Sequence, residues 1–317
     1  MASFLTDFMQ KAEENHLLVL YCQVHKDGCM MDRTTRFGKI NTGLTAFAGV
    51  SRMESYSTAK SFSAAGVGIA LDEGLISLDE RVADSFPELT YDVINSYALE
   101  TTVEDMLTMS SGLSHPLFFR DSPERASVRD WPRYFYERGD FVYESGTKFL
   151  YSNFNTYMLG CLVERKAGVN LLDYMRFRLF EPLGIGNPDM TTCPHKHTVA
   201  ANGLSINVDE MNRFGVMLLN KGVYNGKRVL SEKFVNAALS PKIATEVKGF
   251  WPSSKQTLDY GYQFWVDSPN QCGFLYGILG QFCLILSEKN AVVTVQALEE
   301  NDRLLGSLIW EHIVEKL

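Results

Sequence analysis

Two residues one helical turn apart, Ser57 and Lys60, are the first in this 317-residue sequence whose spacing suggests chemistry. Side chains at positions i and i+3 of a helix share a face, so this hydroxyl and this amine can exchange a proton. Because the ordinary pKa of lysine is about 10.4, almost every lysine is protonated at neutral pH and cannot act as a base. Ser57 is therefore a nucleophile only if burial or nearby positive potential lowers the pKa of Lys60. Otherwise it is an ordinary helix N-cap.

The residues that follow favour a nucleophile. Positions 61–70 (SFSAAGVGIA) are small or apolar and precede the next charge, at Asp72, which indicates a helix buried on all sides. The N-terminus of a helix carries the positive end of the helix dipole, which disfavours a protonated lysine and favours an oxyanion nearby. A second pair at the same spacing, Ser145 and Lys148 in ESGTKF, follows a glutamate and contains a glycine, which is typical of an exposed turn. The sequence thus predicts Ser57 as the nucleophile.

The elements that must position this pair are predicted from hydrophobic periodicity, which places strands near both ends of the chain and helices between them. The predicted strands are 17–25, 260–266, 282–287 and 291–298. The predicted helices are 3–14, the helix that contains Ser57, 102–109, 155–166, 171–179, 209–219, 231–239 and 304–316. This order favours an α+β fold in which one antiparallel sheet is flanked by helices. We expect an α/β lobe from 1–50 and 245–317, a mainly helical lobe at 51–244, and the active site between them.

Several stretches, in order along the chain, resemble the serine β-lactamase and penicillin-binding-protein-like hydrolases, especially their class C-like esterase and amidase branch. STAKSFSAAGVGIALDEGLISLDERVADSFPEL resembles the nucleophile helix and the segment after it, and TVEDMLTMSSGL resembles the next helix and turn. GTKFLYSNFNTYMLGCLVERKAG, RLFEPLGI, GLSINVDEMNRFGVMLLNKGVYNGKRVLSEKFV and YGYQFWV are also similar to that family. The resemblance implies a β-lactamase/transpeptidase-like fold and hydrolysis of an ester or amide through an acyl-enzyme.

The resemblance also implies roles for Tyr151 and Asn153 in the second motif, Tyr-Ser-Asn. Tyr151 is expected beside Ser57 and Lys60 as general base or proton relay, and Asn153 is expected to bind Lys60 and the carbonyl side of the substrate. A lysine ammonium near a phenol would lower the pKa of the phenol, which suits a base. The alternative is structural, with an aromatic core residue followed by a turn asparagine.

The third motif of the family is altered in this chain. Where the family often has a cation, a hydroxyl residue and glycine, this sequence has Leu275, Tyr276 and Gly277. Gly277 would let a substrate approach the backbone closely. By resemblance, the N–H groups of Ser57 and Ile278 form the oxyanion hole. Because Leu275 cannot bind a carboxylate, the motif favours an uncharged ester or amide over a penicillin or a peptide carboxyl terminus.

Other histidines and aromatic residues offer weaker candidates. The segment CPHKH brings Cys193, His195 and His197 together, but a metal needs three or four convergent ligands and no fourth is evident, so we expect no metal and no cofactor. His115 can line the site or serve a structural purpose. The aromatic residues of SVRDWPRYFYERGDF either cap the pocket or pack between helices. The sequence lacks the G-x-S-x-G, H-E-x-x-H, P-loop and G-x-G-x-x-G motifs of other enzyme classes.

Composition bounds the partners and the location. The net charge of −8 does not favour nucleic acid or an anionic membrane surface as partners, and no apolar run reaches the length of about 18 residues that spans a membrane. The N-terminal residues do not resemble a secretory signal, although a leader removed earlier would leave no trace, and the six scattered cysteines are typical of reduced core thiols. We therefore expect a cytoplasmic protein with a small-molecule ester, amide or β-lactam substrate; the oligomeric state is left open. The alternatives are a catalytically silent binding protein on the same fold, or a true β-lactamase or D-amino-acid peptidase.

Overall fold

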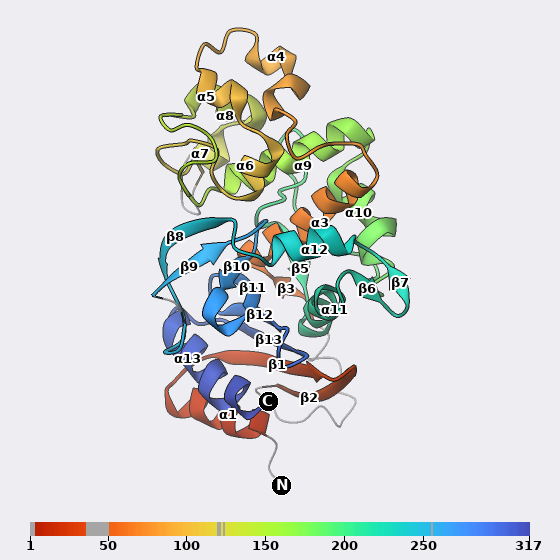
Figure 1. The fold of residues 1–317 in the computed structure, drawn as a ribbon, viewed down its shortest axis with the longest axis vertical. Helices are drawn as coiled ribbons and strands as arrows, with labels where there is room; N and C mark the ends of the chain where they lie inside the picture. The colour runs from red at the N-terminus through yellow and green to blue at the C-terminus, as the bar shows by residue number, and fades with distance from the viewer. Residues whose placement is uncertain (1–3, 36–50, 119–121, 123, 255) are drawn as a thin grey trace.

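A large antiparallel sheet forms the centre of the protein, seen in a computed structural model that describes residues 4–35, 51–118, 122, 124–254 and 256–317. Its strands come from both ends of the described chain and lie in the order β2-β1-β13-β12-β11-β10-β9-β8. Their bounds are β1 Val19–Lys26, β2 Cys29–Thr35, β8 Ile243–Lys248, β9 Thr257–Tyr260, β10 Trp265–Asp267, β11 Cys272–Gly277, β12 Gln281–Leu286 and β13 Ala291–Ala297. The first strand therefore pairs with the last. The chain between β2 and β8, the two edge strands, runs from one edge of the sheet to the other (Figure 1).

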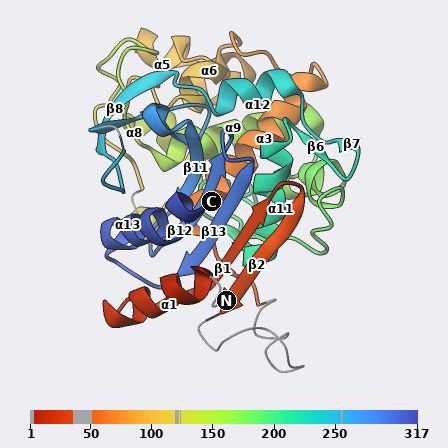
Figure 2. The same cartoon turned by 60° about the horizontal axis from the view of Figure 1, so that its bottom comes forward.

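Helices cover both faces of this sheet, which explains why its central strands are mainly apolar on both faces. In β12, Phe282 and Leu284 belong to a core formed with α1 (Phe4–Glu14) and α13 (Asp302–His312). The alternate residues Cys283 and Ile285 belong to the other core, which includes α11 (Val208–Leu219) and α3 (Ala59–Asp72). Figure 2 shows α1 and α13 on one side of β12 and β13 and α11 on the other. A strand with both faces buried loses the usual alternation of polar and apolar residues.

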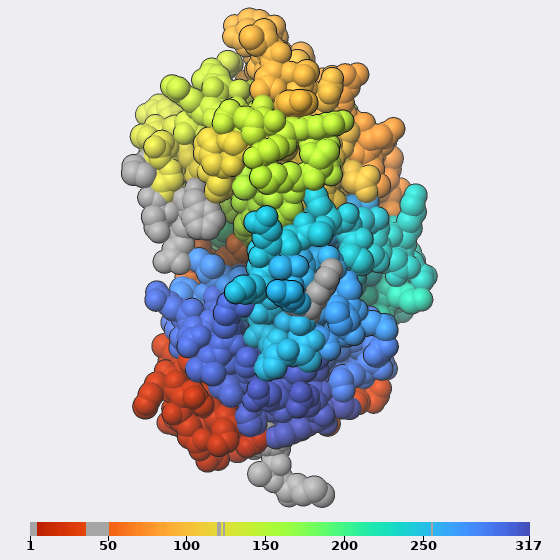
Figure 3. Space-filling model, turned by 60° about the vertical axis from the view of Figure 1, so that its left-hand side comes forward, coloured from red at the N-terminus to blue at the C-terminus, as the bar shows by residue number. Residues whose placement is uncertain are grey.

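The middle of the chain is mainly helical. Its helices between residues 87 and 167 stand beyond one end of the sheet (Figure 1), and the space-filling view shows this part in yellow and green above the blue C-terminal part (Figure 3). Besides α3 and α11, the helices of the middle of the chain are α4 Pro87–Thr90, α5 Ser96–Glu100, α6 Val103–Leu107, α7 Glu124–Ser127, α8 Trp131–Arg138, α9 Asn153–Ala167, α10 Leu171–Met175 and α12 Glu232–Ala238. Short strands join them: β3 Met53–Glu54, β4 Asp189–Met190, β5 Leu204–Ile206, β6 Val223–Tyr224 and β7 Lys227–Arg228.

Local sequence signals fix several helix ends. Thr102 and Asp105 form a complete capping box at the start of α6. Helix α9 ends at Gly168, whose φ of 70° is the left-handed conformation that glycine adopts most readily. These signals fix the start of α6 and the end of α9, the helix that begins at Asn153 of the second motif.

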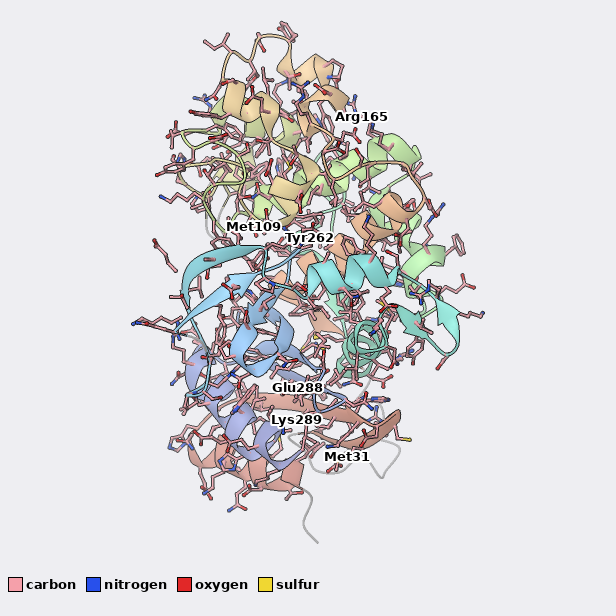
Figure 4. The ribbon with its side chains drawn as sticks, in the orientation of Figure 1. Met31, Met109, Arg165, Tyr262, Glu288 and Lys289 are labelled. Carbon is pink, nitrogen blue, oxygen red and sulfur yellow. The ribbon has the colours of Figure 1, made fainter. Side chains whose placement is uncertain are left out.

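The predicted strand 260–266 is wrong, because the chain turns in its middle. Residues 261–264 form the connection between β9 and β10, with Gln263 at a φ of 64°. The Gln263 side chain is 2% exposed and donates to the main-chain oxygens of Met106 and Leu107, each at 2.9 Å. Met109 and Tyr262, labelled in Figure 4, lie at this junction of the helices with the sheet. A tertiary contact thus overrides the β propensity of the aromatic residues.

Strands β2 and β8 lack the apolar signal that would have predicted them. They are the two edge strands, and both expose several residues, including Met30 and Met31 in β2. The α+β fold with an antiparallel sheet and a mainly helical region is confirmed. The division into two lobes stays a prediction, and its boundary at residue 50 lies outside the described residues. Within the described residues, none of the helices has the length and apolar character needed to cross a membrane.

Candidate active site

Ser57 lies on a short 3-10 turn, η1 (Tyr56–Thr58), that leads directly into α3. Tyr56 has a φ of 49°, which is rare for a large side chain and indicates local backbone strain beside the serine. Thr58, not Ser57, occupies the N-cap position of α3, so the interpretation of Ser57 as a helix cap is wrong. The first twelve residues of α3 are all buried, as the apolar sequence predicted. The serine therefore precedes a buried helix, and Lys60 lies within its first turn.

The Lys60 amine lies inside the protein and against Ser57. The residue is 1% exposed, and its Nζ lies 3.2 Å from Ser57 Oγ. Nζ also lies 2.7 Å from Asn153 Oδ1 and 2.9 Å from the main-chain oxygen of Ala201. Burial, assisted by the positive charge of Arg125, lowers the pKa of Lys60 from its ordinary value to about 7. The structure thus meets the condition that the sequence set for an activated serine.

Tyr151 completes a cluster of reactive groups around Ser57. Its hydroxyl is hydrogen-bonded to the Ser57 side chain, and its ring centroid lies 4.9 Å from Lys60 Nζ. The ring stacks on Trp265, with centroids 5.7 Å apart and planes 15° apart, which fixes its orientation. Burial raises the pKa of Tyr151 well above its ordinary value, so the expectation that Lys60 would lower this pKa is wrong. The cause is that desolvation opposes the phenolate more strongly than the hydrogen bond with Ser57 stabilises it.

Asn153 joins the second motif to Lys60. It is the first residue of α9, and Ser152 caps that helix by accepting a hydrogen bond from the main-chain N–H of Phe154. The position places the Asn153 amide against Lys60 Nζ and in the wall of the pocket that contains Ser57. The second motif thus contacts Lys60 through Asn153, as the resemblance implied.

Gly277 brings the third motif against η1, the turn that contains Ser57. A Cβ atom there would lie 2.5 Å from the Ser55 carbonyl oxygen and 3.1 Å from the Ser57 amide nitrogen. Glycine is therefore required for β11 to approach η1 this closely; the expectation that it also lets a substrate approach β11 stays a prediction. Ile278 follows in the turn to β12 and lines the same pocket as Ser57.

The other two residues of this motif face different surroundings. Leu275 is 1% exposed and belongs to the hydrophobic core, so the position of the family cation is filled by packing. Tyr276 lines the pocket, and its hydroxyl donates to the Asp302 carboxylate at the start of α13.

These residues surround one pocket with a volume of about 630 Å³. Its wall consists of two charged residues, five polar or phenolic residues beside Ser57, and two aliphatic residues: Glu54, Tyr56, Ser57, Arg125, Tyr151, Asn153, Asn202, Tyr276, Ile278 and Leu279. Sequence reasoning missed Arg125 and Asn202. Neither belongs to a recognisable motif, and only the folded chain brings them to Ser57.

Comparison with known proteins agrees with this geometry. The sequence model of the Beta-lactamase family matches residues 42–301, which is most of the chain. The chain belongs to the Beta-lactamase family. It is 27% identical over 242 residues to the 6-aminohexanoate-dimer hydrolase of Paenarthrobacter ureafaciens, a match that covers 70% of this chain and 59% of that protein. The chain thus spans less than two thirds of this curated relative.

Solved structures share the fold of this Beta-lactamase-family protein. A family VIII carboxylesterase superposes with a TM-score of 0.74 and 18% identity, over 99% of this chain and 97% of that one. A penicillin binding protein from Bacillus halodurans superposes with a TM-score of 0.70 and 17% identity, over 96% of this chain and 98% of that one. The resemblance to β-lactamases and penicillin-binding proteins, and the β-lactamase/transpeptidase-like fold, are therefore confirmed.

The second Ser-x-x-Lys sequence of this Beta-lactamase-family chain forms no comparable pair. Ser145 Oγ lies 3.0 Å from Thr101 Oγ1, and the exposed Lys148 donates to the Tyr143 hydroxyl at 3.0 Å. That hydrogen bond raises the pKa of Lys148, which keeps its amine protonated. The difference between the two pairs is burial, as the neighbouring residues predicted.

In the cysteine and histidine segment, the side chains of Cys193 and His197 have different partners. His197 Nδ1 lies 2.6 Å from Glu164, and Cys161 is the third group within 4.8 Å that could share a metal with them. Cys193 instead lies 3.3 Å from the Tyr157 hydroxyl. The Glu164 carboxylate also accepts main-chain hydrogen bonds, from Leu171 at 3.0 Å and Thr198 at 2.9 Å, which explains its burial by a structural role. This cluster lines a different pocket from the one at Ser57.

His115 and the aromatic segment do not line the Ser57 pocket. His115 is exposed, and its Nδ1 lies 2.9 Å from Ser114 Oγ. Trp131 and Phe135 of α8 are buried and pack against Phe118 and Phe154 respectively. The aromatic segment therefore packs between helices.

Proposed function

We propose that this protein is a serine hydrolase that cleaves an ester or amide through an acyl-enzyme on Ser57. The observation that carries the proposal is the Lys60 amine, which is buried, lies 3.2 Å from Ser57 Oγ and has a pKa of about 7. At neutral pH about half of such a group is a free base, compared with roughly one in 2,500 for an ordinary lysine. The names of the relatives, a carboxylesterase and a 6-aminohexanoate-dimer hydrolase, support this substrate class.

The hydrogen bonds around Lys60 suit a neutral amine. A neutral amine has two N–H donors and one lone pair. As an ammonium, Nζ donates to Ser57 Oγ, Asn153 Oδ1 and the Ala201 oxygen. In the neutral form its two donors stay with Asn153 and Ala201, and its lone pair accepts the Ser57 hydroxyl proton. As Ser57 Oγ bonds to the substrate carbonyl carbon, Lys60 takes its proton and becomes an ammonium.

Tyr151 then serves as the proton relay, not as the base. Its raised pKa keeps the phenol protonated, and its hydroxyl contacts Ser57, where the leaving group departs. The phenol gives its proton to the leaving alcohol or amine while the Lys60 ammonium returns one to the phenol. In the second half of the reaction a water molecule attacks the acyl-enzyme and gives its proton to the neutral Lys60. Ser57 then leaves with a proton, and the acid is released.

Backbone N–H groups stabilise the oxyanion in this proposal. The donors are Ser57 and Ile278, and the close approach of Gly277 to the Ser57 amide supports their convergence. Such donors are worth about 10²–10³ in rate each. No step requires a metal or a cofactor.

The alternatives make different predictions. A silent binding protein would keep the pocket but would not be acylated at Ser57. A true β-lactamase would turn over nitrocefin as fast as esters, which the buried Leu275 argues against.

A cytoplasmic location remains part of the proposal. Its support is that all six cysteines lie among the described residues and are free thiols, five buried and only Cys29 exposed.

Labelling with a fluorophosphonate, followed by intact-mass analysis and peptide mapping, tests the proposal. We expect one adduct per chain on Ser57, no adduct in Ser57→Ala, and parallel loss of 4-nitrophenyl ester hydrolysis. The matched control is Ser145→Ala, which should label and hydrolyse like the wild type. Equal hydrolysis by the wild type and Ser57→Ala would refute the proposal, and an unlabelled but folded wild type would favour the silent binding protein.

A further inference from the structure

Arg125 is a cation in the wall of the Ser57 pocket to which the mechanism gives no direct contact. It lies on α7, in the helical region, and shares the pocket wall with Ser57 and Asn153. One guanidinium nitrogen lies 3.3 Å from Asn202 Oδ1, and the guanidinium carbon lies 5.6 Å from the centre of the Trp131 ring. These two contacts hold the side chain in place at the pocket.

The contacts of Arg125 leave most of its donors available. A guanidinium has five N–H donors, and the described structure uses one of them, toward Asn202. No carboxylate of the described residues forms an ion pair with Arg125, in contrast to Arg52, which pairs with Glu210 at 2.6 Å. Because a partly buried cation without a counter-ion is costly, this arrangement favours an anion as ligand.

Among the residues that the structure describes, Arg125 is the one cation in the pocket wall. Leu275 fills the position of the family cation on β11 and is buried in the core. Of the described residues in this wall, Glu54 is the only other charged one, and it is exposed. Positive charge is therefore supplied from the helical side of the pocket and not from the sheet.

On the basis of the proposed hydrolase function, we propose that Arg125 binds a carboxylate of the substrate, so that the pocket selects esters or amides that carry a second, anionic group. The guanidinium fork matches the two oxygens of a carboxylate, and Asn202 and Asn153 add amide donors to the same wall. This substrate class replaces the uncharged ester or amide that Leu275 alone suggested.

Arg125 has a second effect, which the experiment must separate from carboxylate binding. Its charge also lowers the pKa of Lys60, so its loss would slow every substrate at neutral pH. That effect acts equally on anionic and neutral substrates. Carboxylate binding changes the ratio of their kcat/KM values, and this ratio is therefore the quantity to measure.

The experiment uses two matched series of chromogenic esters on the full chain. In the first series the anionic group is on the acyl side. The mono-4-nitrophenyl esters of succinate, glutarate and adipate are compared with 4-nitrophenyl butyrate, pentanoate and hexanoate respectively, which have acyl chains of the same length. In the second it is on the leaving group: 4-acetoxybenzoate is compared with 4-methylphenyl acetate. Assays at about pH 9 keep Lys60 of the wild type neutral, because that pH is well above its pKa of about 7. A change of this pKa in a variant slows both members of a pair alike, so it leaves the ratio unchanged.

We expect the wild type to prefer the anionic member of at least one pair. In Arg125→Gln the anionic-to-neutral ratio of kcat/KM should fall about 10- to 100-fold, mainly through KM, and Arg125→Lys should restore part of it. The matched control is Arg129→Gln, four residues further along and outside the pocket wall, which should leave the ratio unchanged.

Each outcome has one meaning. A ratio that is equal in the wild type and Arg125→Gln in both series would overturn the carboxylate site, even if both proteins remain active. Loss of all activity in Ser57→Ala, with the ratio effect present in Arg125→Gln, supports both proposals. Hydrolysis that survives in Ser57→Ala would refute the hydrolase mechanism itself, independently of the ratio.

Discussion

At the scale of single residues, burial distinguishes the two lysines that follow a serine by three positions. Lys60 and Lys148 each follow a serine at the same spacing, yet the pKa of Lys60 is lowered to about 7 and that of Lys148 is raised. The apolar residues after Lys60 made this difference predictable from the sequence. Arg125 was not predictable, because nothing in its local sequence indicates that α7 lies beside Ser57.

The lowered pKa of Lys60 should appear in the stability of the protein. Because this pKa lies below its unfolded value, the unfolded chain binds more protons between about pH 7 and pH 10, so the contribution of Lys60 to the free energy of unfolding rises with pH in that window. The difference in this free energy between the wild type and Lys60→Met should increase by up to about 1.4 kcal/mol per pH unit. Urea unfolding at several pH values measures it. Lys148→Met, at an exposed site, should show almost no such slope.

Tyr151→Phe tests the relay. The change keeps the ring on Trp265 but removes the hydroxyl that contacts Ser57, so we expect kcat for an ester to fall about 100-fold or more with the fold retained. Tyr143→Phe, which loses a hydroxyl bound only to the exposed Lys148, should behave like the wild type. Wild-type turnover in Tyr151→Phe would remove Tyr151 from the mechanism.

At the scale of elements, the site depends on β11 lying directly against η1. The family resemblance placed Gly277 and Ser57 in one site, but the reason for the glycine, a close approach of two backbones, required the structure. The same holds for the turn between β9 and β10: its residues favour a strand, and only the contacts of Gln263 with α6 explain the reversal. Long-range contacts of this kind leave no periodic signal in the sequence.

Gly277→Ala should misplace η1. The added Cβ would lie 2.5 Å from the Ser55 oxygen, so β11 or η1 must shift, and we expect the fluorophosphonate labelling rate to fall about 100-fold. Gly186→Ala is the matched control, because a Cβ there meets nothing within 4 Å. Equal labelling rates in the two variants would mean that the contact between β11 and η1 does not position Ser57.

At the scale of the whole molecule, the two ends of the described chain close the fold. The strand β1 pairs with β13, and α1 packs with α13 over the same face of the sheet, so the sheet that supports β11 depends on residues far away in sequence. Terminal strands around a helical middle already predicted this closure. The edge strands β2 and β8 could not be predicted from the sequence, because an exposed edge strand does not need an apolar face.

Phe8→Ala should show how much this closure contributes. Phe8 is fully buried in the core shared by α1, α13 and the sheet, so its loss should lower the free energy of unfolding by about 3–5 kcal/mol. Phe177→Ala, at a residue 69% exposed, should change it by less than about 0.5 kcal/mol. Denaturant unfolding compares the two, and similar losses would contradict the role assigned to α1.

The pH dependence of Ser57 acylation tests the central claim most directly, because it reports the protonation state of the base. The rate of fluorophosphonate labelling should rise with pH and reach half of its maximum near the Lys60 pKa of about 7, and it should be lost in Lys60→Met. A midpoint near the ordinary lysine pKa of about 10 would contradict the account, as would labelling of Lys60→Met at the wild-type rate.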